Sequence, residues 1–330
     1  MMKLIRRALR AHEKMQVKRA VAAAAFGQDV KQMDRMLLDR AISILPNKPI
    51  PFGLPDLDLV TCERVADNLC RIELKSGRIF YGQRSEQKQY VWHHLLKDIV
   101  PSQVSGDAYK LALDIQMRYF GSKTLPWYFP RGGTFVEGGC YTGMKAIRWH
   151  DLLEGNCRII AVEIGRSNYD ILKMNLSANG LMDKIVPVHA GLWKEDGTMT
   201  HKHNYTTRRF LERTDRWEPH FLNEEEARVV TIRTLLDEQQ IETVEYFNIQ
   251  VNGSEVEVLN GLRDMDRVKV FGVAAYYGKD GVRNVDVVRE MALSRGCRIL
   301  AESAAGRIEF VTPRFVDEIM AMQPKAKRGH

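Results

Sequence analysis

The chain has 330 residues, of which 45% are hydrophobic, and a formal net charge of +7 at pH 7. This length and composition suffice for one large hydrophobic core and a smaller second one, and no stretch approaches the ~20 apolar residues of a membrane span. Five cysteines without a C-x-x-C pair favour a reducing compartment over a disulfide framework, so we expect a folded, soluble, cytoplasmic protein.

The excess of positive charge lies at the beginning of the chain. Residues 1–40 hold ten Lys and Arg against four Asp and Glu. We expect the helical-looking segment 3–26 to be a solvated or oligomerising arm, with peripheral contact to an anionic surface as the alternative. A nucleic-acid groove would need positive charge beyond this arm, so no nucleic acid is expected as a partner.

The front part of the chain is predicted to be a mostly helical accessory domain, residues 1–125. Apolar spacing predicts a helix over 29–45, and four prolines between 46 and 55 indicate a linker. The sequence LCRIELKSGRIFYG predicts two strands around residues 75–77, and helical patterns follow at 86–99 and 107–120. Residues 126–315 then form the main domain, and 316–330 a basic tail.

In the main domain, strands and helices alternate. Strands are predicted at 134–138, 158–163, 184–189, 244–251 and 268–275, with helices from about residue 144 and over 168–179. The polar stretch 194–228 is expected to be a substrate lid or specificity loop, and Ser254 with Glu257 a capping box. The segments CRILAES and RIEFVTP predict a terminal hairpin. The order indicates an α/β fold, a Rossmann-like, doubly wound, mostly parallel seven-stranded sheet closed by an antiparallel C-terminal hairpin.

The stretch TFVEGGCYTG, Thr134–Gly143, predicts a ligand site. Gly139 permits a turn after the first strand, and Gly143 permits close approach where the next helix begins, so we expect free N–H groups to face a ligand. Glu163 ends the second strand, where a carboxylate can accept the hydrogen bonds of a ribose diol. An ordinary strand–helix turn with a surface glutamate is the alternative.

The glycine spacing separates two classes of nucleoside cofactor. A dinucleotide fingerprint needs G-x-G-x-x-G, whereas the glycines here fall at 138, 139 and 143. Glu137 would repel a pyrophosphate and suits the ammonium of a methionine group. S-Adenosylmethionine is therefore favoured over a nicotinamide cofactor, which leaves an oxidoreductase as the less favoured interpretation.

Three segments resemble the FkbM-like class I S-adenosylmethionine-dependent methyltransferases, over roughly residues 126–315. VEGGCYTG resembles V-D-x-G-A-N-x-G, and EYFNIQVNGSEVEVLNG resembles D-x-I-K-I-D-V-E-G-x-E-x-x-V-L-x-G. EIGRSNYDILKMNLSANG is similar to E-P-x-P-x-N-x-x-x-L-x-x-N-x-x-x-N, with matches at Glu163, Asn168, Leu172, Asn175 and Asn179. The chain departs from the third motif where the family has one lysine and two acids, which are here Asn248, Gln250 and Asn252.

The resemblance implies in-line methyl transfer to a hydroxyl of a sugar, glycan or natural product, with a small molecule or glycan as partner. It implies cofactor contacts at the strand ends and turns: Glu137, Gly138, Gly139, Cys140, Tyr141, Gly143, Glu163, Ile164, Asn168, His189, Ala190 and Gln250. The three neutral amides motivate a second hypothesis, a methyltransferase fold that serves only as a cofactor-binding or assembly module.

A hydroxyl acceptor benefits from a general base, although alignment with the methyl group contributes most. The candidate catalytic residues are His189, Glu255 and Tyr276, and Tyr276 and Tyr277 are also expected to line the acceptor site. The alternatives are a structural histidine, a carboxylate that only meets a helix dipole, and tyrosines that form a wall. His201 and His203 have no nearby cysteine and no suitably spaced carboxylate, so no metal site is expected.

Overall fold

The computed structural model describes residues 59–66, 69–83, 118–119, 125–203, 223–263, 265–276, 278–279, 282–303 and 306–324. The chain divides into two compact units, Met1–Met117 and Arg118–His330, which are described separately below. Several predicted segments lie outside the described residues: the basic arm 3–26, the helices at 29–45 and 86–99, nearly all of the helix at 107–120, the linker 46–55 and residues 325–330 of the tail.

The first unit contains a three-stranded antiparallel sheet in the order β1-β2-β3, made of β1 Leu59–Ala66, β2 Leu69–Leu74 and β3 Ile79–Gln83. The two strands predicted around residues 75–77 are confirmed as β2 and β3, which place the buried Ile72 opposite the buried Phe80. The sequence did not predict β1. Its sequence LVTCERVA carries the charged pair Glu63-Arg64, so it shows no regular alternation, and pairing with β2 supplies the ordering instead.

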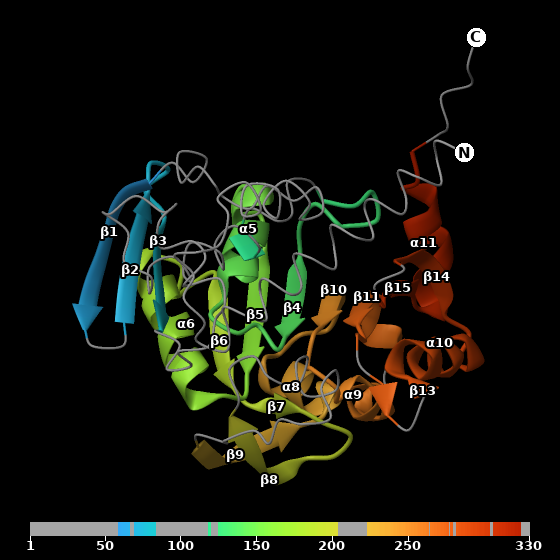
Figure 1. The fold of residues 1–330 in the computed structure, drawn as a ribbon. Helices are drawn as coiled ribbons and strands as arrows, with labels where there is room; N and C mark the ends of the chain where they lie inside the picture. Colours follow the sequence, from blue (N-terminus) through green and yellow to red (C-terminus); the bar gives the residue numbers. More distant parts are fainter. Residues whose placement is uncertain are drawn as a thin grey trace, which may run out of the picture. The chain divides into compact units, whose positions relative to one another are not determined.

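The second unit is built on a seven-stranded sheet in the order β14-β15-β11-β10-β4-β5-β6 (Figure 1). Every neighbouring pair is parallel except the two pairs that include β15. This arrangement confirms the predicted mostly parallel sheet with an antiparallel terminal hairpin. The strands are β4 Thr134–Gly138, β5 Arg158–Glu163, β6 Ile185–His189, β10 Val244–Ile249, β11 Val268–Ala274, β14 Arg298–Glu302 and β15 Arg307–Val311.

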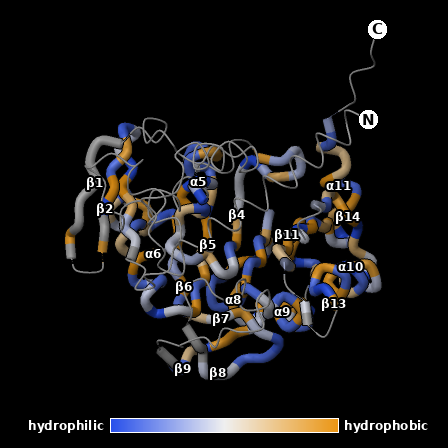
Figure 2. The backbone as a smooth tube through the Cα atoms, in the orientation of Figure 1, coloured by the Kyte–Doolittle hydropathy of each residue, from blue (hydrophilic) through white to orange (hydrophobic). Residues whose placement is uncertain are grey.

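Helices connect these strands, and hydrophobic residues recur along the strands while mixing with hydrophilic ones along the helices (Figure 2). The helices are α5 Met144–Leu152, α6 Arg166–Ala178, α8 Ile232–Glu238, α9 Glu255–Gly261, α10 Asn284–Ser294 and α11 Val316–Ala321, with 3-10 turns at Met265–Arg267 and Pro313–Phe315. No helix among the described residues is both long enough and apolar enough to cross a bilayer.

The two faces of the sheet have different coverings. On one face, Phe135 of β4 and Tyr246 of β10 pack with Trp149 of α5 and with Phe129. The residues between them on the strands belong to the main core, which also includes buried side chains of α8, α9 and α10. Because strand side chains alternate between faces, Glu137 and Asn248, two residues further along, share the α5 face.

The predicted polar loop at 194–228 contains more structure than the sequence indicated. β7 Gly191–Leu192, β8 Gly197–His203 and β9 Asn223–Val230 form a separate sheet in the order β7-β9-β8, and residues 204–222 lie outside the described part. The register places Lys202 opposite Glu224 and His201 opposite Glu225. Neither β8 nor β9 has a sustained alternation of apolar and polar residues, which is why hydrophobic spacing missed this sheet.

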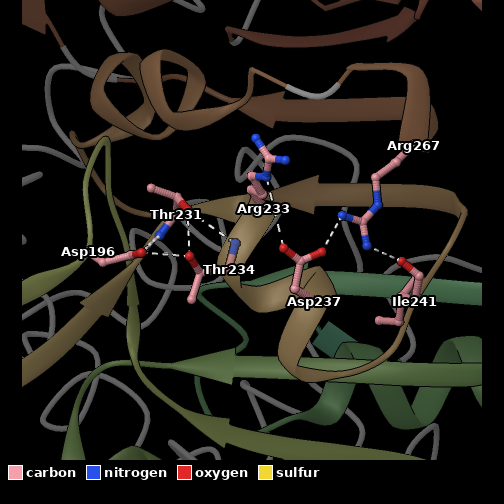
Figure 3. Close-up of polar contacts among 7 residues, drawn as sticks. All are labelled: Asp196, Thr231, Arg233, Thr234, Asp237, Ile241 and Arg267. Atoms are coloured by element: carbon pink, nitrogen blue, oxygen red, sulfur yellow. Dashed lines mark hydrogen bonds and ion pairs between the residues drawn. The ribbon is translucent and has the colours of Figure 1, made fainter.

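Polar contacts attach the turn before β8 to the start of α8 (Figure 3). Asp196 accepts hydrogen bonds from Thr231 N at 2.7 Å and Thr234 Oγ1 at 2.6 Å, and these donors hold the pKa of its carboxyl below the ordinary value. Thr231 also caps α8 by accepting from Thr234 N. At the other end of α8, Arg267 donates to Asp237 at 2.5 Å. These contacts position the insertion relative to β10.

The predicted capping box is wrong. Ser254 is the N-cap residue of α9, but no side-chain capping bond forms among the described residues, since its ψ of 14° is not the extended conformation of a capping serine. Glu255 instead accepts from Gly253 N at 2.7 Å.

Candidate functional site

The site predicted from the sequence lies where β4, β5 and β10 end. β4 is the central strand from which the chain proceeds to β5 and β6 on one side and to β10 and β11 on the other. Open α/β sheets bind ligands at such a switch point, outside the carboxyl ends of the strands. Glu137, Gly138 and Glu163 lie at the ends of β4 and β5, and Gln250 directly follows β10, so the structure brings these predicted residues to one edge.

The turn after β4 requires glycine at two positions. Gly139 has φ 74°, and a Cβ there would lie 2.0 Å from the Gln250 carbonyl oxygen. Gly143 has φ 78°, and a Cβ there would lie 2.3 Å from Leu172 Cδ1. The turn therefore passes so close to β10 and α6 that a side chain would displace its neighbours.

The N–H groups of this turn are largely used within the protein, contrary to the expectation that they face a ligand. Gly139 and Cys140 both donate to Val162 O, at 2.9 and 3.0 Å, and Gly143 donates to Cys140 O. Tyr141, in the left-handed region at φ 59°, donates its N–H to Glu163 Oε2 at 2.9 Å. The close packing of β4 on β5 consumes these donors, so ligand recognition falls to side chains and the first turn of α5.

The Glu163 carboxylate is partly occupied. Oε1 accepts from Gly165 N at 3.0 Å and from Asn168 Nδ2 at 3.2 Å, whereas Oε2 accepts from Tyr141 N. Burial raises the pKa of Glu163 while these three donors oppose the rise. Asn168 Oδ1 is buried and has no hydrogen-bond partner among the described residues. Glu163 Oε2 thus keeps one acceptor position, and Asn168 Oδ1, on a side chain bonded to the same carboxylate, keeps another for the hydroxyls of a ligand.

A second group of polar residues lies at the ends of β4 and β10, and we call Glu137, Lys145, Asn248 and Gln250 the tip cluster. Lys145 Nζ lies 3.6 Å from Glu137 Oε1 and donates to Gln250 Oε1 at 2.8 Å. Glu137 is 2% exposed, and burial raises its pKa; its Oε2 has no partner within the described residues. A buried carboxylate oxygen without a donor suits a cationic ligand group.

Arg307 and Glu309 extend the tip cluster, and sequence reasoning missed both. Arg307 donates to Asn248 Oδ1 at 3.0 Å and to the Tyr246 hydroxyl at 2.7 Å, and it pairs with Glu309 at 2.6 Å. Burial opposes the charge of Arg307, but Tyr246 and Glu309 outweigh burial and raise its pKa. The only sequence signal was the charge alternation in RIEFV, a strand whose other residues are apolar.

His189 ends β6, which lies on the opposite side of β5 from the strands β4 and β10 of the tip cluster. Its ring stacks on Tyr169, with centroids 4.7 Å apart, and Nε2 lies 3.1 Å from Ile164 O. Ala190, the next residue, donates to Glu163 O. His189 ends β6, three strands from β10, so at about 4.8 Å per strand it is roughly 14 Å from that strand. It is therefore placed beside Glu163 and not beside the tip cluster.

The other candidate catalytic residues are separated from one another. Glu255 has no exposed surface, and it accepts from Gly253 N and from Asn284 Nδ2 at 2.9 Å. Tyr276 follows β11 and is 38% exposed. Tyr277 and the side chains of the predicted His201 and His203 lie outside the described part of the chain. Cys140 is buried, which raises the pKa of its thiol well above the ordinary value.

Comparison with known proteins gives one family. Residues 140–291 match the model of the methyltransferase FkbM domain, from the turn after β4 into α10. A search of curated proteins finds no match.

Several solved structures have similar coordinates at low sequence identity, and three of them follow. A methyltransferase FkbM from Methylobacillus flagellatus is 13% identical over 62% of this chain and 54% of its own, with a TM-score of 0.39. A putative tRNA (m1A22) methyltransferase of Streptococcus pneumoniae, in complex with S-adenosyl-L-methionine, is 16% identical over 56% of this chain and 68% of its own, with a TM-score of 0.34. Fibrillarin of Aeropyrum pernix, with natively bound S-adenosyl-L-methionine, is 15% identical over 77% and 100%, with a TM-score of 0.33. The chain spans about half the length of the M. flagellatus protein.

Proposed function

We propose that this chain is a methyltransferase of the FkbM kind, which its match to that domain over residues 140–291 supports, and that it uses S-adenosylmethionine to methylate a hydroxyl oxygen of a sugar, glycan or natural product. When bound, this cofactor would supply a methyl group on a sulfonium, and an oxygen nucleophile attacks that methyl carbon in line with the departing sulfur. The residues of the chain hold the cofactor and align the acceptor.

The observation that carries the proposal is the pair of open acceptor positions at the end of β5. Glu163 Oε2 and Asn168 Oδ1 belong to two side chains that are joined by a hydrogen bond of 3.2 Å from Asn168 Nδ2 to Glu163 Oε1. That bond also fixes which way the Asn168 amide points. Two neighbouring hydroxyls of a ribose would each find one acceptor, so the residues present fit the nucleoside.

The methionine end of the cofactor fits the end of β4. Glu137 Oε2 is buried without a partner in the described residues, and an ammonium would supply the missing donor. Lys145 Nζ lies on the other side of the carboxylate, 3.6 Å from Oε1, and leaves Oε2 to the ligand. Gly139 and Gly143 let the turn beside this carboxylate pack directly against β10 and α6.

Calorimetric titration tests the cofactor. We expect S-adenosylmethionine and S-adenosylhomocysteine to bind and NAD not to bind. Asn168→Leu removes one of the two diol acceptors and should weaken both sulfur ligands about tenfold, the value of one hydrogen bond at ~1.4 kcal/mol. The exposed Asn260→Leu is the matched control and should bind like the wild type. Binding of NAD alone, or of none of the three ligands, would contradict the proposal.

A non-catalytic binding module is the second candidate. It is favoured by the neutral residues Asn248, Gln250 and Asn252 in place of the three charges of the family motif. Transfer of a labelled methyl group to a panel of glycan and small-molecule hydroxyl acceptors separates the two. Cofactor binding with no transfer to any acceptor would favour the module.

A further inference from the structure

The structure places two cationic side chains against the motif in which Asn248, Gln250 and Asn252 stand at the family's charged positions. Asn248 stands where the family motif has a lysine, and its Oδ1 accepts from Arg307 of β15 at 3.0 Å. Gln250 stands where the motif has an acid, and its Oε1 accepts from Lys145 of α5 at 2.8 Å. The two cations therefore arrive from elements far from the motif in the sequence.

Lys145 has the position and access that a proton acceptor needs. It lies in the first turn of α5, at the switch point between β4 and β10, and a quarter of its side chain is exposed. His189 lies about 14 Å from β10 at ordinary strand spacing, and Glu255 has no exposed surface. Neither of these alternatives can reach an acceptor beside Gln250.

We infer that Lys145 accepts the proton of the methyl-acceptor hydroxyl, and that binding of the cofactor converts Lys145 from ammonium to neutral amine. The inference rests on the proposed function, because it requires a cationic cofactor at the end of β4.

The charges around Lys145 make this conversion reasonable. Burial lowers the pKa of Lys145, Glu137 from β4 raises it, and Arg307 from β15 and Arg118 from the segment 118–119 lower it further. Glu137 is thus the acidic group that favours the protonated form of Lys145. Once Glu137 also meets the ammonium of the cofactor, and a sulfonium lies nearby, Lys145 loses part of this stabilisation and gains another like charge.

The proton and electron balance of the transfer is then complete. The acceptor oxygen bonds to the methyl carbon as the carbon–sulfur bond breaks, its electron pair goes to sulfur, and the hydroxyl proton passes to the lone pair of Lys145 Nζ. Lys145 becomes an ammonium next to Glu137 again, and it returns its proton to solvent through its exposed part when the next cofactor binds.

The test measures protons released on cofactor binding. Calorimetric titrations with S-adenosylmethionine in buffers of different ionisation enthalpy give the number of protons released, at each pH from about 7 to about 10. The variant Lys145→Arg keeps the cation but does not titrate in this range. The α-amino group of the cofactor also titrates there, so the informative quantity is wild type minus Lys145→Arg.

We expect the wild type to release more protons than Lys145→Arg, up to one per site, and its affinity to rise with pH relative to that of Lys145→Arg, by up to about tenfold per pH unit where a full proton is released. The difference should be smaller with S-adenosylhomocysteine, which lacks the sulfonium charge. Lys173→Arg, an exposed lysine on α6, should release protons like the wild type. If Lys145→Arg does not fold, Lys145→Gln provides the same comparison.

Two results would overturn the inference alone: cofactor binding with equal proton release in wild type and variant, or unchanged methyl transfer by Lys145→Arg to an acceptor found in the panel. A base of this kind contributes roughly a hundredfold or more to the rate, so a loss of that size is expected. If the wild type binds neither sulfur ligand, the proposed function fails as well, and this result is distinct from the other two.

Discussion

Replacing Glu163 by glutamine tests the arrangement of donors around the end of β5. Each neighbour of this carboxylate is a donor: Gly165 N and Asn168 Nδ2 on Oε1, and Tyr141 N on Oε2. A glutamine at this position must point its own NH2 group at one of the two sides. The loss of stability is smaller when the NH2 group faces Tyr141 N, because one hydrogen bond is then broken and the two at the other oxygen remain.

The size of the effect follows from that single bond. A hydrogen bond to a charged acceptor contributes about 1.5–3 kcal/mol. Burial raises the pKa of Glu163, so a neutral side chain recovers part of this free energy. We therefore expect Glu163→Gln to lower the free energy of unfolding by about 2 kcal/mol. Because the same oxygen is the open acceptor for a ribose hydroxyl, cofactor affinity should also fall, by about tenfold to a hundredfold.

Urea unfolding followed by circular dichroism measures the first quantity, and calorimetric titration with S-adenosylhomocysteine measures the second. The exposed Glu242→Gln is the matched control and should change stability by less than about 0.5 kcal/mol. If Glu163→Gln unfolds and binds like this control, the three donors do not hold Glu163 as described, and the assignment of the ribose position is refuted.

Three further outcomes are expected. Gly139→Ala should abolish cofactor binding in calorimetry, because its methyl group would lie 2.0 Å from a backbone oxygen. The control Gly180→Ala, at φ 65° with no atom near the added methyl group, should bind the cofactor normally. Equal loss of binding in both variants would show that the positive φ, and not the clash, is responsible. Arg307→Met leaves Glu309 buried without its cation and should lower the free energy of unfolding in urea by about 3–5 kcal/mol; a loss under 1 kcal/mol would contradict the ion pair. Burial raises the pKa of Glu137, so the native state binds this proton more tightly than the unfolded chain does. The free energy of unfolding of the wild type minus that of Glu137→Gln should therefore fall as the pH rises above about 4.3. A difference that grows with pH would contradict the raised pKa.

The seven-stranded sheet could be predicted because its central strands are buried on both faces. Ile159–Val162 and Phe135–Val136 are continuous apolar runs, each followed at once by a charged residue and a turn. Such runs can be recognised as buried strands from the local sequence alone. β8 and β9 are polar and depend on pairing with each other, and the missing cap at Ser254 depends on a backbone angle, so neither could be read from residue type.

The positions of some candidate site residues could be predicted from the sequence, and those that could not be predicted share one cause. Gly139 and Glu163 could be placed at strand ends because a turn and a strand end lie at a fixed spacing along the chain. Lys145 contacts Gln250 across 105 positions, and Arg307 contacts Asn248 across 59. No short motif contains such pairs. The third motif therefore lacked charged residues at Asn248, Gln250 and Asn252 in the sequence, although α5 and β15 place the cations Lys145 and Arg307 against it.

A crystal structure of the protein with S-adenosylhomocysteine tests the central claim most directly, namely that β4 and β5 hold the cofactor at their carboxyl ends. The account predicts ribose hydroxyls within about 3 Å of Glu163 Oε2 and Asn168 Oδ1, and the ligand ammonium beside Glu137. A ligand bound elsewhere, or ribose hydroxyls that contact neither of these oxygens, would contradict it.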